Sequence, residues 1–173
     1  GLEIVKGDAL GNIQRAELFD YQYHLDKLHK SVDRDEWWMT PQTVNAVNLP
    51  LQNALNFPAA ILQPPYFDPK ASNAYNYGSM GSIIGHEISH GFDDQGAQYD
   101  AQGRLSDWWT PEDLKKFQTR TDCVARQFDN YFVEPGIHHN GKLVLGESIG
   151  DLAGAKIAYR AFQIAQRGKE PIP

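Results

Sequence analysis

The spacing of apolar residues along the chain predicts a mainly helical protein. Apolar side chains recur at three-to-four spacing over residues 8–30, 77–92 and 145–167, which is typical of helices with one buried face. Asp8 stands where the first of these helices needs an N-terminal cap. A further helix is predicted over residues 110–133, because it opens with a threonine cap, a proline and two acids.

Two short segments upstream of the central helix have a different pattern. Residues 43–47 form a β-like run that Pro50 ends, and residues 56–62 read as a second extended piece. Pro58 favours an edge position for that piece, since proline cannot donate to a central ladder. Pro135 and Gly136 are interpreted as the stop of the third helix. The predicted fold class is α+β, mainly helical, with a small edge sheet.

Composition limits the functional classes but does not choose among them. The chain has 173 residues, 41% hydrophobic and 22% charged, so it is long enough for one domain with a real core. A net charge of −6 without a basic run argues against nucleic acid as a partner. No apolar run approaches the roughly 20 residues that a membrane span needs. Cys123 is a lone cysteine, interpreted as a part-buried thiol rather than a nucleophile, and it leaves the redox compartment open.

The central helix carries the most informative motif, His86-Glu87-Ile88-Ser89-His90. Positions i and i+4 share one helix face, so both imidazoles can reach a single ion. Glu87 is displaced by about 100° around the helix, which keeps it from the metal but within reach of a zinc-bound water. This is the position that a general base requires. The alternative is that the pattern is incidental and both histidines are ordinary exposed side chains.

A third ligand is predicted at the start of the last helix. Catalytic zinc takes three protein ligands and keeps one position open. Glu147 opens that helix and Asp151 follows at i+4, so one carboxylate can ligate while the other accepts the free N–H of a ligating histidine. The alternative is that Glu147 stands at the helix N-terminus only because its negative charge interacts favourably with the helix dipole. The small residues around it favour close packing instead: Gly146, Gly150, Ala153 and Gly154.

Together these segments resemble the neprilysin family of zinc metallopeptidases, within the gluzincin group. The resemblance extends over nearly the whole chain, in the right order, through five stretches: 44–46, 57–67, 86–96, 107–110 and 146–151. It implies a partial thermolysin-like catalytic core. It also implies one Zn²⁺ held by His86, His90 and Glu147, with Glu87 as the base and Asp151 as partner of a ligating histidine.

The resemblance further implies how a peptide substrate binds. Asn45 and Ala46 would pair with the peptide backbone, through the asparagine side chain and the alanine carbonyl, as an added strand. The family usually has an aromatic residue shortly after this pair, where Val47 and Asn48 stand here. That departure alters either a substrate subsite or only local packing.

Other titratable residues are given less specific roles. Asp93 and Asp94 either orient His90 or form an exposed acidic turn. His138 and His139 are expected in a solvated loop, and a structural role on a helix face is expected for His24 and His29.

The expected protein is therefore a zinc-dependent metalloendopeptidase acting on short peptides. Residues 1–173 are expected to form one partial catalytic domain, without the family's helical cap domain and without the C-terminal segment that supplies a histidine and an arginine. The alternative is a truncated zinc-binding fragment without appreciable activity. In the family that histidine and arginine stabilise the oxyanion of the transition state and bind substrate, and losing such donors costs about 10²–10³ in rate. An extracytoplasmic location, periplasmic, secreted or membrane-anchored, is favoured over a cytoplasmic one.

Overall fold

The computed structural model describes residues 1–168. The chain divides into two compact units, Gly1–Arg34 and Asp35–Pro173. The first unit consists of one helix, α1 (Ala9–Leu25), and short flanking segments. Asp8 caps α1 by accepting a hydrogen bond from the backbone N–H of Gly11, as predicted, and the helix ends five residues before the predicted position.

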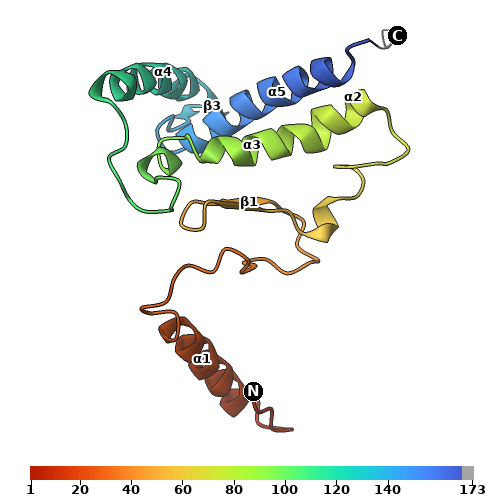
Figure 1. Cartoon of the computed structure of the whole chain (residues 1–173), viewed down its shortest axis with the longest axis vertical. Helices are drawn as coiled ribbons and strands as arrows, with labels where there is room; N and C mark the ends of the chain where they lie inside the picture. The colour runs from red at the N-terminus through yellow and green to blue at the C-terminus, as the bar shows by residue number, and fades with distance from the viewer. Residues whose placement is uncertain (169–173) are drawn as a thin grey trace. The chain divides into compact units, whose positions relative to one another are not determined.

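The second unit is built on two helical segments that lie side by side (Figure 1). The first runs without interruption through α2 (Asn73–Asn76), the π-helical turn η2 (Tyr77–Gly81) and α3 (Ser82–His90). The second is α5 (Leu145–Ala165). The two segments are antiparallel, because Ala158 lies near Gly81, at the start of α3, and Gly146 lies near Asp93, just past its end.

Glycines allow α3 and α5 to approach to backbone contact. A Cβ atom on Gly154 would lie 2.5 Å from the Ser82 carbonyl oxygen and 2.7 Å from the His86 nitrogen. A Cβ atom on Gly150 would lie 2.8 Å from two atoms of the His86 ring. The small residues that the sequence places in the last helix therefore do pack closely, and they pack on the helix with the two histidines.

A β-hairpin lies beside α3 (Figure 1). Its strands β1 (Val47–Leu49) and β2 (Ala54–Asn56) are antiparallel, with Asn48 opposite Leu55. The small core of this unit, Ala46, Ile61 and Met80, joins the chain just before β1 to the helical segment, with Phe57 and Ile83 packed against it. The core thus fixes residues 45–48 next to the helix.

The remaining elements complete the second unit. They are the 3₁₀ turns η1 (Ala59–Ile61) and η3 (Gly96–Gln98), the helix α4 (Pro111–Asp129), and a second hairpin, β3 (Phe132–Glu134) and β4 (Ile137–His138). Thr110 caps α4, as the sequence predicts, by accepting from the N–H of Asp113. The architecture is α+β and mainly helical, which confirms the predicted class.

Several predicted boundaries were wrong. The first strand begins at Val47 rather than Thr43, and the second covers Ala54–Asn56 and ends before Pro58, which starts η1 instead of an edge strand. The hairpin β3–β4 was missed, because its turn at Pro135-Gly136 reads equally well as the end of a helix. Gly136 adopts a positive φ of 83° in that turn, which glycine allows without strain.

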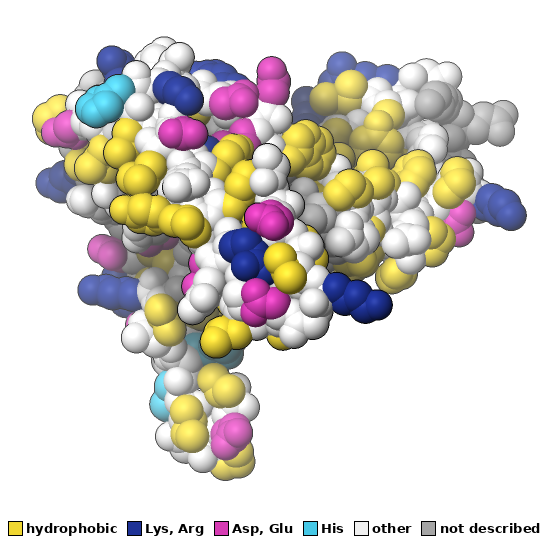
Figure 2. Space-filling model, turned by 90° about the horizontal axis from the view of Figure 1, so that it is seen from below, with side chains coloured by type: hydrophobic (Ala, Val, Ile, Leu, Met, Phe, Trp, Pro, Cys, Tyr) yellow, Lys and Arg dark blue, Asp and Glu magenta, His cyan; other side chains and the backbone are white. Residues whose placement is uncertain are grey.

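Many large apolar side chains are exposed on the second unit, among them Trp37, Trp38, Phe92, Leu105 and Trp108. The face in Figure 2 shows apolar side chains scattered between charged ones. Within residues 1–168, no helix combines the length and the apolar composition that crossing a membrane requires.

We expect Gly154→Ala to lower the free energy of unfolding by about 1–3 kcal/mol, because the new methyl group overlaps backbone atoms of α3. Gly78→Ala is the matched control: it is the same change in a helical segment, at a position with no atom within 4 Å of the new Cβ. Urea denaturation followed by circular dichroism measures both. Equal stability of the two variants would contradict the close packing described here.

Candidate metal and catalytic site

The two histidines of the central motif lie on one face of α3. Their ring centroids are 4.5 Å apart and the rings are nearly perpendicular. The ring of His86 fits against α5 because Gly150 has no side chain. The i, i+4 spacing therefore brings the rings together, as the sequence predicts.

Each histidine has its own aspartate. Nδ1 of His86 lies 2.9 Å from Oδ1 of Asp151 on α5, and Nδ1 of His90 lies 2.7 Å from Oδ2 of Asp93. A carboxylate only accepts hydrogen bonds, so each Nδ1 carries the proton and donates it. In the neutral tautomer that this fixes, both Nε2 atoms have a free lone pair.

Asp93 is buried and held from several sides. Its side chain is 7% exposed and accepts the backbone N–H groups of Gln95 and Gly96 through Oδ1. Burial alone would raise the pKa of Asp93, but the hydrogen bonds from His90 and the two backbone N–H groups lower it overall. The hydrogen bond to Asp93 likewise raises the pKa of His90. The sequence left two roles open for Asp93, orienting His90 or forming an exposed acidic turn. The structure agrees with the first, because Asp93 is buried and bonded to His90.

Glu147, in the first turn of α5, faces both histidines with one carboxylate. Its Oε2 lies 3.3 Å from Nε2 of His86, and its Oε1 lies 3.8 Å from Nε2 of His90. Two imidazole lone pairs and an anionic carboxylate thus converge from two helices. With both Nε2 lone pairs free, these groups repel one another unless a metal ion lies between them, and the donor set is one that zinc prefers.

Glu87 is a second buried acid of the site, with 7% of the residue exposed. Ligand atoms of His86, Glu87 and His90 all lie within 4.8 Å of one another. Burial raises the pKa of the Glu87 carboxyl above its ordinary value, although the two histidines and a hydrogen bond from the backbone of Asn48 oppose this. A raised pKa brings a carboxylate closer to the range in which it accepts a proton effectively at neutral pH.

Asn45 and Ala46 line the same cleft as the histidines. The cleft has a volume of about 410 Å³ and is also lined by Glu87 and Glu147. The Oδ1 atom of Asn45 accepts the backbone N–H of Ala46, which leaves the Nδ2 group as the donor that the side chain can offer to a ligand. Six of the seven predicted site residues thus line this cleft, and the seventh, Asp151, lines a neighbouring hollow of about 270 Å³ that shares Asn45, His86 and Glu87 with it.

Other residues considered from sequence lie elsewhere. His138 bonds through Nδ1 to the carbonyl of Asp129 in the β3–β4 hairpin, and His24 bonds to the carbonyl of Asp20 on α1. Cys123 is exposed on α4 rather than part-buried. Asn48 contacts Glu87 and was not singled out as a site residue from the sequence.

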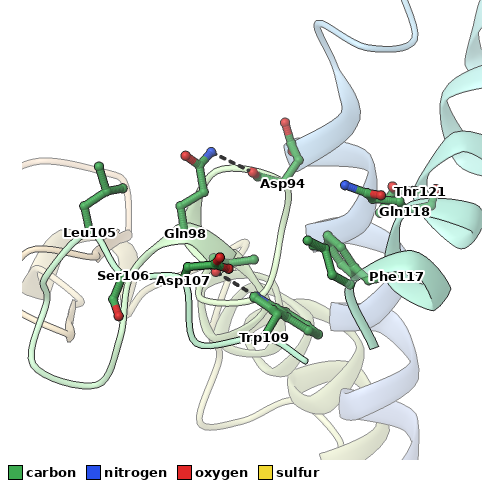
Figure 3. A pocket seen from close by; sticks show the side chains of 11 residues that line it. Asp94, Gln98, Leu105, Ser106, Asp107, Trp109, Phe117, Gln118 and Thr121 are labelled. Carbon is green, nitrogen blue, oxygen red and sulfur yellow. Dashed lines mark hydrogen bonds between the residues drawn. The ribbon is translucent and has the colours of Figure 1, made fainter. Parts of the chain in front are cut away.

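A second hollow, of about 500 Å³, lies on the α4 side of the loop that follows Asp93 (Figure 3). Trp109 stacks on Phe117 at 5.2 Å between centroids and donates its indole N–H to the carbonyl of Ala97. Gln98 donates to the carbonyl of Asp94. Trp109 thus anchors the loop that carries Asp93, which gives this tryptophan a structural role near the site.

Comparison with known proteins is consistent with this geometry. Residues 45–173 match the model of Peptidase family M13. Over 173 residues the chain is 42% identical to an endothelin-converting enzyme homolog of Locusta migratoria, covering 99% of this chain and 24% of the relative. It is 43% identical to neprilysin-11 of Caenorhabditis elegans, covering 99% of this chain and 21% of the relative. The chain thus spans about a quarter of the length of these relatives.

Solved structures resemble the chain equally clearly. The zinc metalloprotease Zmp1 of Mycobacterium tuberculosis, in complex with an inhibitor, matches with a TM-score of 0.92 and 50% identity, covering 99% of this chain and 27% of that one. PepO of Lactobacillus rhamnosis matches with a TM-score of 0.86 and 39% identity, covering 98% and 26%. The likeness at this level confirms the predicted fold.

We expect Asp93→Asn to weaken zinc binding by about 10–100-fold, because the amide no longer holds the proton on Nδ1 of His90. Competition with a fluorescent chelator measures the dissociation constant. Asp107→Asn is the control, since it removes a carboxylate that lines the second hollow and not the histidine cleft. Unchanged zinc affinity in Asp93→Asn would contradict the orienting role.

Proposed function

We propose that this chain, which belongs to peptidase family M13, forms the zinc-binding and peptide-binding core of a metallopeptidase acting on short peptides. His86, His90 and Glu147 hold one Zn²⁺, Glu87 is the general base and Asp151 orients His86. One observation carries the proposal: a single carboxylate of α5 faces the Nε2 atoms of both histidines of α3.

The donor set fits zinc better than other common ions. Two imidazole nitrogens and one carboxylate are a ligand set typical of catalytic zinc. Tetrahedral bonds of about 2.0–2.1 Å place neighbouring ligand atoms about 3.3 Å apart. The separation between Glu147 and His86 is 3.3 Å and that between Glu147 and His90 is 3.8 Å, so little movement closes the site. Calcium and magnesium prefer oxygen ligands, which argues against them here.

Each residue of the site then has a separate task. When bound, zinc polarises the scissile carbonyl and lowers the pKa of a coordinated water toward about 7. Glu87 takes the proton of the attacking water and passes it to the leaving amine, a role that its raised pKa supports. Asp93 and Asp151 keep the protons of both histidines on Nδ1, so the Nε2 atoms stay available as ligands.

The segment before β1 supplies the contacts to the substrate backbone. The Asn45 amide donates to a peptide carbonyl and the Ala46 carbonyl accepts from a peptide N–H. Main-chain pairing of this kind is independent of side chains, so it supports a peptide substrate without choosing its sequence.

A second candidate function is zinc binding without appreciable hydrolysis. It is favoured by the share of the relatives that this chain spans, about a quarter. Comparing hydrolysis by this chain and by a relative of full length under the same conditions separates the two candidates. We further propose an extracytoplasmic location for the protein, which fractionation of producing cells tests.

We expect Glu87→Gln to retain one zinc ion per chain and to lose turnover by at least about 10²-fold, because the amide cannot accept the proton. Metal analysis and cleavage of a quenched fluorescent peptide measure the two effects. Glu112→Gln, which changes a surface glutamate paired with Lys116, is expected to match the wild type. Normal turnover in Glu87→Gln would remove Glu87 from the mechanism.

Zinc should also stabilise the fold, since it links α3 to α5. At a free concentration 100 times the dissociation constant, binding adds about 2.7 kcal/mol. For a chain of this size we expect the melting temperature to rise by about 5–10 °C. Chelator should reverse the shift, and His90→Ala should abolish it. A shift of equal size in His90→Ala would place the metal elsewhere.

A further inference from the structure

Asn48 of β1 connects the hairpin to the helix that carries the proposed base. Its side-chain Nδ2 donates a hydrogen bond of 2.7 Å to the backbone carbonyl of Glu87, 39 positions along the chain. Its backbone N–H also lies close enough to the carboxylate of the same glutamate to oppose the rise in its pKa. A single residue of the strand thus binds the main chain of Glu87 and faces its side chain.

The end of α3 leaves the Glu87 carbonyl in need of this partner. In a regular helix the N–H of Gly91 would bond to the carbonyl four residues earlier, which is that of Glu87. Here it bonds to the carbonyl of Ile88 at 3.2 Å, so the last turn is tightened. The carbonyls of a last helical turn need partners from outside the helix, and Asn48 is one.

The position of Asn48 in the hairpin makes the contact specific. Asn48 follows Asn45 and Ala46 by two or three residues, and it pairs with Leu55 across the hairpin. It also lines the cleft that holds the histidines and Glu87. Any shift of β1 along α3 therefore moves the peptide-binding segment and the proposed base relative to each other.

We infer that Asn48 is a positioning residue, which fixes the geometry between the strand that binds the peptide and the carboxylate that takes the proton. The inference rests on the proposed function and deepens it. Asn48 acts through Glu87 rather than on the substrate, so its loss affects the rate of the bound complex more than the binding of peptide. Small displacements of a base from its working geometry are costly, about 10²-fold for 1 Å.

The test compares Asn48→Ala and Asn48→Leu with Asn53→Gly in the zinc-loaded chain. Asn53 is the matched control, because its Nδ2 also bonds a distant carbonyl, that of Ala101, and its φ of 46° suits glycine. We expect kcat to fall at least 10-fold in both Asn48 variants, with KM and zinc content within twofold of the wild type. Asn53→Gly should keep kcat within twofold.

Two results would overturn the inference. One is an unchanged kcat in the Asn48 variants. The other is a loss of kcat that Asn53→Gly shares, or that comes with an equal loss of bound zinc, because either would indicate general damage to the hairpin. The Leu variant controls for the cavity that Ala would leave, since leucine keeps the side-chain volume and removes only the amide.

If the wild-type chain turns over peptide no faster than Glu87→Gln does, the proposed activity of this chain is refuted instead. The positioning role is then decided by hydrogen exchange at the Asn48 backbone amide. We expect Glu87→Ala to accelerate that exchange at least 10-fold, with Val47 and Leu49 as internal references. Equal exchange in wild type and variant would overturn the inference without reference to activity.

Discussion

The close contact between α3 and α5 is the constraint on which the rest of the site depends. His86 and His90 lie on one face of α3, and the carboxylate of Glu147 that faces them lies 57 residues beyond His90. Glycines at 85, 150 and 154 bring the two helices to backbone distance, which is shorter than side-chain packing allows. At the usual helix separation of 8–10 Å, Glu147 and Asp151 would have to reach across a layer of side chains. The packing of the core and the chemistry of the cleft are therefore decided by the same few residues.

The acidic side chains around the histidine pair make the site electrostatically favourable for a cation. Glu87, Asp93, Glu147 and Asp151 surround two imidazoles that their aspartates keep in a single tautomer. Asp93 is buried and braced by backbone N–H groups, whereas Asp151 is largely exposed. The two histidines are thus oriented by unequal means: one by a rigid loop, the other by the neighbouring helix. The loop in turn depends on Trp109, whose indole bonds to Ala97.

Sequence alone was sufficient for the elements with strong local rules. The caps at Asp8 and Thr110 and the i, i+4 spacing of His86 and His90 depend only on neighbouring residues, so they could be predicted. The hairpins could not be placed accurately, because short strands take their limits from a partner strand and not from their own pattern. Asn48 has no local signature at all: its role depends on a carbonyl 39 positions away. Asp93 was an intermediate case, since its spacing from His90 allowed the contact but only burial distinguishes it from a surface turn.

The π-helical turn at Tyr77–Gly81 has a consequence for how this helical segment tolerates change. A π turn contains one residue more than an α-helical turn, and that residue rotates everything downstream by about 100° relative to what precedes it. Within the turn, Tyr77 contacts Phe162 of α5, whereas Met80 packs in the core with Ala46 and Ile61, so the side chains of this one turn have two different sets of neighbours. Deleting one residue from this turn would restore regular helix and rotate the face that carries His86 and His90 away from α5. The number of residues in this turn is therefore as constrained as their types, even though none of their side chains lines the histidine cleft.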